Sequence, residues 1–311
     1  MKSVEANGIT IGYDSFGDEN VEVILLISGL GAQMVRWTAP FCDRLAAKGF
    51  RVIRFDNRDA GRSTHFTYVA PPDFSALANA IAAGRTPDVP YTLHDMAADA
   101  IGLLDSLKID RAHVVGRSMG GMIAQLMSSE YPERILSLTS IMSSTGNPNL
   151  PSAATDIMAM LTTRAPHPSE DEAGFLEHSL AFARRIASPG YPFNEEAHRI
   201  LVLEEVRRAY DPAAFGRQLG AIAAVGDIRS RLARIVAPAL VVHGVDDPLI
   251  PLECGRDTAA SIRGAEFMPV YGMGHDLPSA LYQAIADAIG RTARRRGAEP
   301  SSPSNGGESV G

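Results

Sequence analysis

The stretch Gly116-Arg117-Ser118-Met119-Gly120-Gly121 decides the fold of this 311-residue chain. It follows an apolar run at 112–115 and precedes a helix-like run at 122–127, so it predicts a strand, a sharp turn and a helix in succession. A serine held exposed at such a turn can act as a nucleophile when a base and backbone N–H donors lie beside it. Ser118 is therefore the candidate nucleophile.

Two motifs further along the chain supply candidate partners for this serine. The apolar run at 239–243 predicts a buried strand and leads into a turn-rich loop with two carboxylates, Asp246 and Asp247. A second short strand at 266–270 leads to His275 on a glycine-flexed loop. We expect His275 to be the base and one of the two carboxylates to orient it.

The three candidate residues follow the order serine, acid, histidine along the chain, which differs from the orders in chymotrypsin and subtilisin. With this order the chain resembles the α/β-hydrolase family over about residues 5–292. The family pattern Gly-x-x-Asp-x-x-(Ile/Val)-Pro matches at 244–251, which implies that Asp247 completes the triad and Asp246 is a loop residue. Some members carry the acid after the strand that follows the nucleophile helix. Here residues 143–147 include no Asp or Glu, so the acid of the triad cannot come from that position.

The resemblance also implies an oxyanion hole and a subgroup. Ser28-Gly29-Leu30-Gly31 stands where the family has His-Gly-x-Gly, so the backbone N–H groups of Leu30 and Met119 are expected to bind the oxyanion, with a serine replacing the usual histidine. Residues 56–63 resemble the family's Asp-x-Arg-Gly-x-Gly-x-Ser with Asp59 in place of a glycine. This variant is similar to the aclacinomycin methylesterase-like subgroup.

Alternating strand and helix signals predict an α/β fold: a doubly wound, mostly parallel sheet with helices on both faces. We expect the hydrolase core at 1–146 and 228–292. Between them, at 147–227, strand signals give way to Pro-punctuated helices, which predicts a helical cap insertion. A second insertion at 65–90 is expected beside the cap, and the Ser-, Gly- and Pro-rich tail at 293–311 is expected to be disordered.

Composition limits the other possibilities. The longest apolar run, around 23–30, is far shorter than the ~20 residues a bilayer requires, the N-terminus lacks a signal-like apolar core, and the two cysteines form no disulfide framework. We therefore expect a cytoplasmic protein with no membrane partner. A net charge of −7 argues against a nucleic-acid partner, and neither a metal motif nor a dinucleotide motif is found, so no cofactor is expected. The oligomeric state is left open.

The predicted function is carboxylic ester hydrolysis through an acyl-enzyme, on a small to medium apolar ester, including a methyl ester or lactone of a natural product. Alternatives are C–C bond or amide hydrolysis or cofactor-free perhydrolysis by the same triad, and a silent ligand-binding member. For Arg117 we favour an internal ion pair or a surface position over contact with a substrate carboxylate. Candidate substrate-binding residues are those that could form an adaptable apolar pocket: Met34, Trp37, Met142, Met158, Met160 and Met273.

Overall fold

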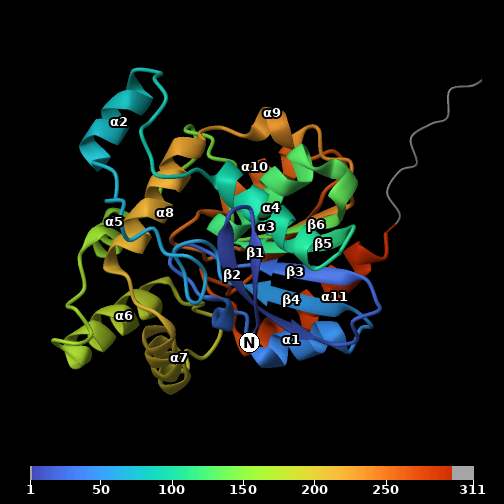
Figure 1. Ribbon diagram of the computed structural model, residues 1–311, viewed down its shortest axis with the longest axis horizontal. Coiled ribbons are helices and arrows are strands. Elements are labelled where there is room, and N and C mark those ends of the chain that lie inside the picture. Colours follow the sequence, from blue (N-terminus) through green and yellow to red (C-terminus); the bar gives the residue numbers. More distant parts are fainter. Residues whose placement is uncertain (1, 296–311) are drawn as a thin grey trace, which may run out of the picture.

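A computed structural model describes residues 2–295 of the chain, and its centre is one eight-stranded sheet (Figure 1). The strand order is β1-β2-β4-β3-β5-β6-β7-β8; β1 and β2 pair antiparallel, β2 pairs antiparallel with β4, and all other neighbours are parallel. This confirms the predicted mostly parallel sheet. The strands are β1 (Lys2–Ala6), β2 (Ile9–Phe16), β3 (Val23–Ile27), β4 (Arg51–Phe55), β5 (Ala112–Arg117), β6 (Ile135–Ile141), β7 (Ala239–Gly244) and β8 (Glu266–Val270).

Helices cover both faces of the sheet, as the continuous apolar strands require. All five residues of β3 and all six of β7 are buried, because a parallel sheet of this kind is covered on both sides. One face carries α1 (Ala39–Ala46) and α11 (Tyr282–Ala293), and the other carries α3 (Leu93–Ser106), α4 (Met119–Glu130), α9 (Arg229–Leu232) and α10 (Leu252–Ser261) (Figure 1). Three 3₁₀ turns complete the core: η1 (Met34–Arg36), η2 (Pro132–Arg134) and η3 (Ser279–Leu281).

A capping motif in the local sequence sets the start of α3. Thr92 forms a capping box with Asp95: its hydroxyl accepts from the Asp95 N–H at 3.3 Å, and the Asp95 carboxylate accepts from the Thr92 N–H at 2.7 Å. The apolar positions of the helix, among them Met96 and Leu103, are buried against the sheet. Local capping and the 3.6-residue period therefore agree on where this helix begins and which face it buries.

The part of the chain between β6 and α9 forms four helices that lie to one side of the sheet (Figure 1). Its two ends meet: the Ile228 N–H donates to the Thr145 carbonyl at 2.9 Å, and a Cβ on Gly146 would lie 2.1 Å from the Gly226 carbonyl oxygen. A segment that leaves and returns at one place can be inserted without disturbing the sheet. These helices are α5 (Thr155–Thr162), α6 (Glu172–Ile186), α7 (Glu195–Arg208) and α8 (Pro212–Val225).

The second insertion lies beside these helices, as expected from the sequence. It carries α2 (Phe74–Ala82), which lies next to α8. Pro71 and Pro72 approach Gly216 and Gly220 of α8 so closely that a Cβ on either glycine would lie 2.9 or 2.6 Å from a proline carbon. Glycine at these two positions therefore permits the close packing of the two insertions.

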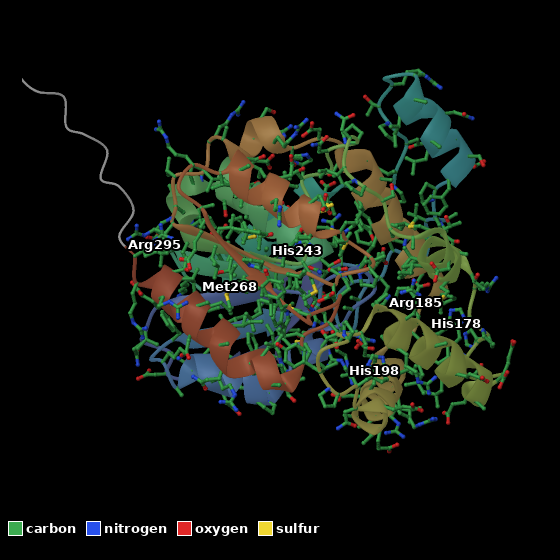
Figure 2. All side chains as sticks on the ribbon, turned by 180° about the vertical axis from the view of Figure 1, so that it is seen from behind. His178, Arg185, His198, His243, Met268 and Arg295 are labelled. Carbon is green, nitrogen blue, oxygen red and sulfur yellow. The ribbon has the colours of Figure 1, made fainter. Side chains whose placement is uncertain are left out.

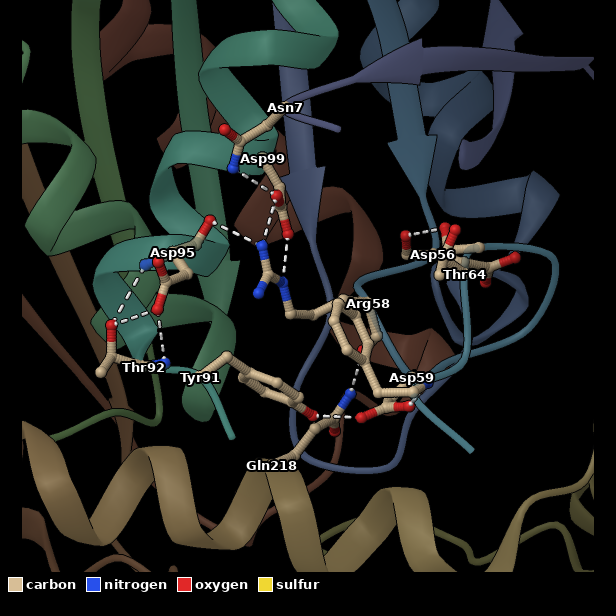
Figure 3. A network of polar contacts seen from close by, with 12 residues as sticks. Asn7, Asp56, Arg58, Asp59, Thr64, Tyr91, Thr92, Asp95, Asp99 and Gln218 are labelled. Carbon is tan, nitrogen blue, oxygen red and sulfur yellow. Dashed lines mark hydrogen bonds and ion pairs between the residues drawn. The ribbon is translucent and has the colours of Figure 1, made fainter. Parts of the chain in front are cut away.

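A buried polar network ties α8 to the loop after β4 (Figure 3). Arg217 is fully buried and donates to both carboxylate oxygens of Asp59 at 2.8 Å, and Tyr91 donates its hydroxyl to Asp59 at 2.6 Å. Gln218 donates to the Arg58 carbonyl at 2.8 Å, while the Arg58 side chain is paired with Asp99. Because a buried charge is costly without its partner, these contacts hold the inserted helices to the core in one position.

The order of the strands also creates the crevice in which the site lies. After β3 the chain moves to one side to form β4, whereas β5 returns to the other side of β3. The loops that leave the carboxyl ends of β3 and β5 therefore diverge, which is where open α/β sheets place ligands. Ser118 and the 28–31 loop both stand at this point.

Three remaining expectations concern the membrane, the cysteines and the tail. Among residues 2–295, no helix has the length and apolar character needed to cross a membrane. Cys42 and Cys254 are both buried and free. The final helix ends at Ala293, and the part of the predicted tail from residue 296 onward lies outside the described residues.

Candidate active site

Ser118 occupies a strained turn between β5 and α4. Its φ of 53° and ψ of −125° lie in a region that costs a non-glycine residue of order 1–3 kcal/mol. The turn is possible only with glycine on either side, because a Cβ on Gly116 would lie 1.9 Å from the Gly120 carbonyl oxygen. The Ser118 N–H donates to the Ile141 carbonyl of β6 at 2.9 Å, which anchors the turn to the sheet.

The structure brings Ser118, His275 and Asp247 into one hydrogen-bonded chain. The Nε2 atom of His275 lies 3.0 Å from the Ser118 Oγ atom, and its Nδ1 atom lies 2.7 Å from Asp247 Oδ2. The side chain of His275 is 7% exposed and that of Asp247 is fully buried, so water competes little for these contacts. The geometry is that of a serine whose proton can pass to a histidine held by a carboxylate.

Two neighbouring carboxylates in the loop after β7 have different surroundings. Asp247 accepts hydrogen bonds from the backbone N–H groups of Leu249 and Ile250 at 2.9 and 2.8 Å, which leaves its other oxygen for His275. Asp246 is exposed and accepts from the Gly272 N–H at 2.8 Å. Asp246 therefore braces the histidine loop from outside, and only Asp247 contacts the imidazole.

The loop after β3 lies directly against Ser118. A Cβ on Gly29 would lie 3.2 Å from the Ser118 Cβ, so glycine allows this approach. The Leu30 N–H makes no hydrogen bond within residues 2–295, and the Met119 N–H is at the first position of α4, where helical N–H groups lack an intrahelical partner. Both N–H groups are therefore available to donate a hydrogen bond beside the serine.

Side chains from outside the loop hold these donors in place. The Gly31 N–H donates to the Gln218 Oε1 atom of α8 at 2.8 Å. Asn57 donates to the Ser28 carbonyl at 3.0 Å, so the loop is braced although Ser28 replaces the usual histidine. No local pattern in the sequence indicates Gln218, because its partner lies 187 positions away.

A second helix of the insertion, α7, also forms hydrogen bonds with the same loop. Glu205 of α7 accepts from Arg36 through both carboxylate oxygens at 2.7 Å, and it also accepts from the Gln33 N–H at 3.3 Å. The Gln33 side chain donates to the Glu205 and Ala209 carbonyls at 2.8 and 3.0 Å. The position of the loop after β3 therefore depends on α7 as well as on the core.

The loop that carries His275 is held by the end of α6. The His275 N–H donates to the Ile186 carbonyl at 2.8 Å, and the Gly274 N–H donates to the Ser188 hydroxyl at 2.9 Å. Ser188 in turn donates its hydroxyl and its N–H to Asp276. Burial raises the pKa of Asp276, and the hydrogen bonds from Ser188 act against this rise. None of these contacts was expected from the sequence.

The six residues predicted to form an apolar pocket differ in how deeply they are buried. Met34, Trp37, Met142 and Met273 are buried, and the last three belong to the core cluster beneath the site. Met160 is half-buried, while Met158 is 42% exposed on α5. Packing in the core is sufficient to explain why four of these residues are buried. A role in substrate binding stays a prediction for all six.

The remaining histidines within residues 2–295 make no hydrogen bond to Ser118, and the buried Nδ1 atoms of His65 and His243 have no hydrogen-bond partner among the described residues. His243, labelled in Figure 2, is fully buried at the end of β7, and its Nε2 atom donates to the Ile250 carbonyl at 2.8 Å. Burial lowers its pKa. His178 and His198 lie on the inserted helices, on the opposite side of the molecule from Arg295 (Figure 2).

One group of side chains within residues 2–295 has the proximity that metal ligands need, and it consists of Asp59, His65 and Asp211. Arg217 bridges the two carboxylates of this group, donating to Asp59 and to Asp211. The Arg217 guanidinium offsets part of the negative charge of the two carboxylates through charge-assisted hydrogen bonds. The group is therefore accounted for as an ionic link between the insertion and the core.

Arg117 differs from what the sequence favoured. Its guanidinium lies over the Trp37 ring, 5.0 Å from the ring centroid, and it is partly buried. It forms no ion pair or hydrogen bond with any other residue in the range 2–295, so the expected internal ion pair is not found. Burial, followed by repulsion from Arg36, lowers the pKa of Arg117 to about 10.

Comparison with known proteins agrees with this architecture. Residues 22–278 match the family model described as alpha/beta hydrolase fold. The chain is 29% identical to rhodomycin D methylesterase of Streptomyces peucetius, over 90% of this chain and 94% of that protein, and 29% identical to a putative carbamate hydrolase of Variovorax paradoxus, over 90% and 96%. The crystal structure of a hydrolase from Pseudomonas aeruginosa PA01 superposes with a TM-score of 0.68 at 27% identity and covers 94% of this chain and 98% of that chain.

Proposed function

The chain belongs to the α/β hydrolase fold family, and from this membership we propose that it is a serine carboxylesterase acting through an acyl-enzyme. The observation that carries the proposal is the continuous hydrogen-bonded chain from Ser118 Oγ through His275 to Asp247, at 3.0 and 2.7 Å. The similarity to a methylesterase supports a small to medium apolar ester, including a methyl ester, as the substrate.

In the first half of the proposed reaction, Ser118 attacks the ester carbonyl while His275 Nε2 takes the hydroxyl proton. Asp247 holds the imidazole through Nδ1 and stabilises the imidazolium that forms. The N–H groups of Leu30 and Met119 stabilise the oxyanion, an effect worth about 10²–10³ in kcat for one such donor. The tetrahedral intermediate then collapses, and the alcohol leaves with the proton from His275.

In the second half, water attacks the acyl group on Ser118. His275 accepts the water proton and later returns a proton to the serine oxygen, which releases the acid. The cap, which we assign to residues 147–227 over a core of 1–146 and 228–292, excludes bulk water and shapes the acyl and alcohol pockets.

The experiment that tests this proposal compares wild type with Ser118→Ala. We expect the substitution to lower ester hydrolysis by several orders of magnitude and to abolish labelling by a fluorophosphonate, because the triad acts as a unit. Ser143→Ala is a matched control, since this nearby hydroxyl donates to the Ser118 carbonyl at 2.8 Å and lies outside the proposed relay. Near wild-type turnover in Ser118→Ala would exclude the proposal.

A second candidate is hydrolysis of a carbamate or amide by the same three residues. It is favoured by the 29% identity to a putative carbamate hydrolase. Parallel assays of an aryl ester, the corresponding aryl carbamate and the anilide distinguish the two candidates. A higher kcat/KM for the carbamate or anilide would favour the second.

A further inference from the structure

Arg117 is a charged side chain next to the nucleophile, and its guanidinium forms no direct ion pair or hydrogen bond within residues 2–295. It occupies the position before Ser118, at the carboxyl end of β5. Its one close contact is the face of Trp37, which is fully buried and whose own indole N–H has no hydrogen-bond acceptor within the described structure. Two donors without acceptors therefore lie together beside the site.

The two carboxylates that act on Arg117 accept their hydrogen bonds from other residues. Glu205 acts on Arg117 from a distance, but both its oxygens are held by Arg36 at 2.7 Å. Asp276 also acts on Arg117, but its Oδ1 atom accepts from the N–H and hydroxyl of Ser188. Neither carboxylate lies within 4.0 Å of the guanidinium, the limit for an ion pair.

Arg36 adds an unfavourable positive charge near Arg117. Burial and the nearby Arg36 lower the pKa of His198 on α7 to about 4, and the same two causes lower the pKa of Arg117. A partly desolvated guanidinium without a counterion is costly, and its planar fork matches a carboxylate in two hydrogen bonds. A planar anion such as a carboxylate would supply that counterion.

We propose that Arg117 binds a carboxylate of the substrate, so that the preferred esters carry a second, free acid group close to the scissile carbonyl. The inference rests on the proposed esterase function and makes its substrate class more specific by adding a free carboxylate to the otherwise apolar ester. Arg117 acts on binding and selection, while Ser118, His275 and Asp247 perform the chemistry. Trp37 supports the guanidinium from its other side through a cation–π contact.

Two substrate pairs test the acyl and the alcohol halves separately. The first compares 4-nitrophenyl hydrogen glutarate with 4-nitrophenyl pentanoate, and the second compares 4-acetoxybenzoate with its methyl ester. In wild type we expect kcat/KM to favour the acid in at least one pair. Arg117→Gln is expected to lower that acid-to-neutral ratio about 10- to 100-fold, which is what a charge-assisted hydrogen bond provides.

Two variants serve as controls for this ratio. Arg117→Lys keeps the positive charge and is expected to retain part of the preference, which separates loss of charge from loss of folding. Arg44→Gln removes an exposed arginine that donates to Gln283 on the far helix, and it should leave the ratio as in wild type. Unchanged ratios in both pairs for Arg117→Gln would overturn the inference.

A binding measurement separates failure of this inference from failure of the proposed function. In the Ser118→Ala background, calorimetry with monomethyl glutarate should give tighter binding than with dimethyl glutarate, and the difference should vanish when Arg117→Gln is added. Ester hydrolysis with unaltered ratios contradicts only the inference. Arg117-dependent binding in a protein that hydrolyses no ester contradicts only the esterase proposal.

Discussion

The hydroxyl oxygen of Ser188 accepts a hydrogen bond from the backbone N–H of Gly274 at 2.9 Å, which joins the end of α6 to the residue before the proposed base. A carbonyl of the same helix end, that of Ile186, accepts from the N–H of His275 itself at 2.8 Å. The inserted helices therefore help to fix the orientation of His275. We expect the cap to affect catalysis as well as substrate choice.

Ser188→Ala tests this coupling. The substitution removes the acceptor for the Gly274 N–H and one donor to Asp276, so the imidazole of His275 should be oriented less precisely. We therefore expect kcat to fall about 10-fold or more, with a smaller change in KM. Ser179→Ala is the matched control, because this serine of α6 bonds only to the Phe175 carbonyl of its own helix. Steady-state kinetics of both variants decide the question. An equal effect of the two substitutions would contradict the coupling.

The two carboxylates after β7 are expected to differ sharply in their effect on activity. Asp247→Asn should lower kcat by up to about 10⁴-fold, because the amide disturbs the tautomer of His275. Asp246→Asn should cost far less, since Asp246 contacts only the backbone of Gly272. The measurement is kcat on one aryl ester for both variants. Equal losses, or a larger loss at Asp246, would show that the acid is misassigned.

Sequence patterns predicted the parts of the molecule that depend on local chemistry. Strand alternation, the capping box at Thr92 and the glycines around Ser118 each require particular residues at short spacing. The contacts of Ser188 and Gln218 could not be predicted, because each joins an inserted helix to a core loop 86 or 187 positions away and no local pattern marks such a pair. The lack of an ion pair at Arg117 within residues 2–295 could not be predicted for the same reason, since an ion pair depends on which distant carboxylates are already occupied.

Cap residues are expected to set preference among chain lengths. Met158→Ala and Met160→Ala should each change the ratios of kcat/KM among acetate, butyrate and octanoate esters, by about 10- to 200-fold at most, the range of a methylene-sized change in a pocket. Met160 is half-buried and Met158 exposed, so the larger change is expected at Met160. If both variants keep the wild-type ratios, neither residue lines the pocket.

His198 makes stability depend on pH in a defined window. Burial and Arg36 lower its pKa from 6.5 to about 4 in the folded protein. Between these values the unfolded chain binds a proton that the folded chain does not, so stability falls as pH decreases from 6.5 to 4 and is fully present above 6.5.

The test is the free energy of unfolding of wild type and His198→Gln, measured from pH 4 to 8. The variant should lose less stability than wild type on acidification through this window, and the two curves should run parallel above it. A wild-type curve no steeper than that of the variant would contradict the assignment.

The most direct test of the account is to identify the covalent intermediate. Wild type mixed with 4-nitrophenyl acetate and quenched in acid within the burst phase should carry one acetyl group, and peptide mass spectrometry should place it on Ser118. The adduct should be absent from Ser118→Ala. An acetyl group on another residue that turns over at the rate of hydrolysis, or a burst that persists in Ser118→Ala, would contradict the proposed mechanism.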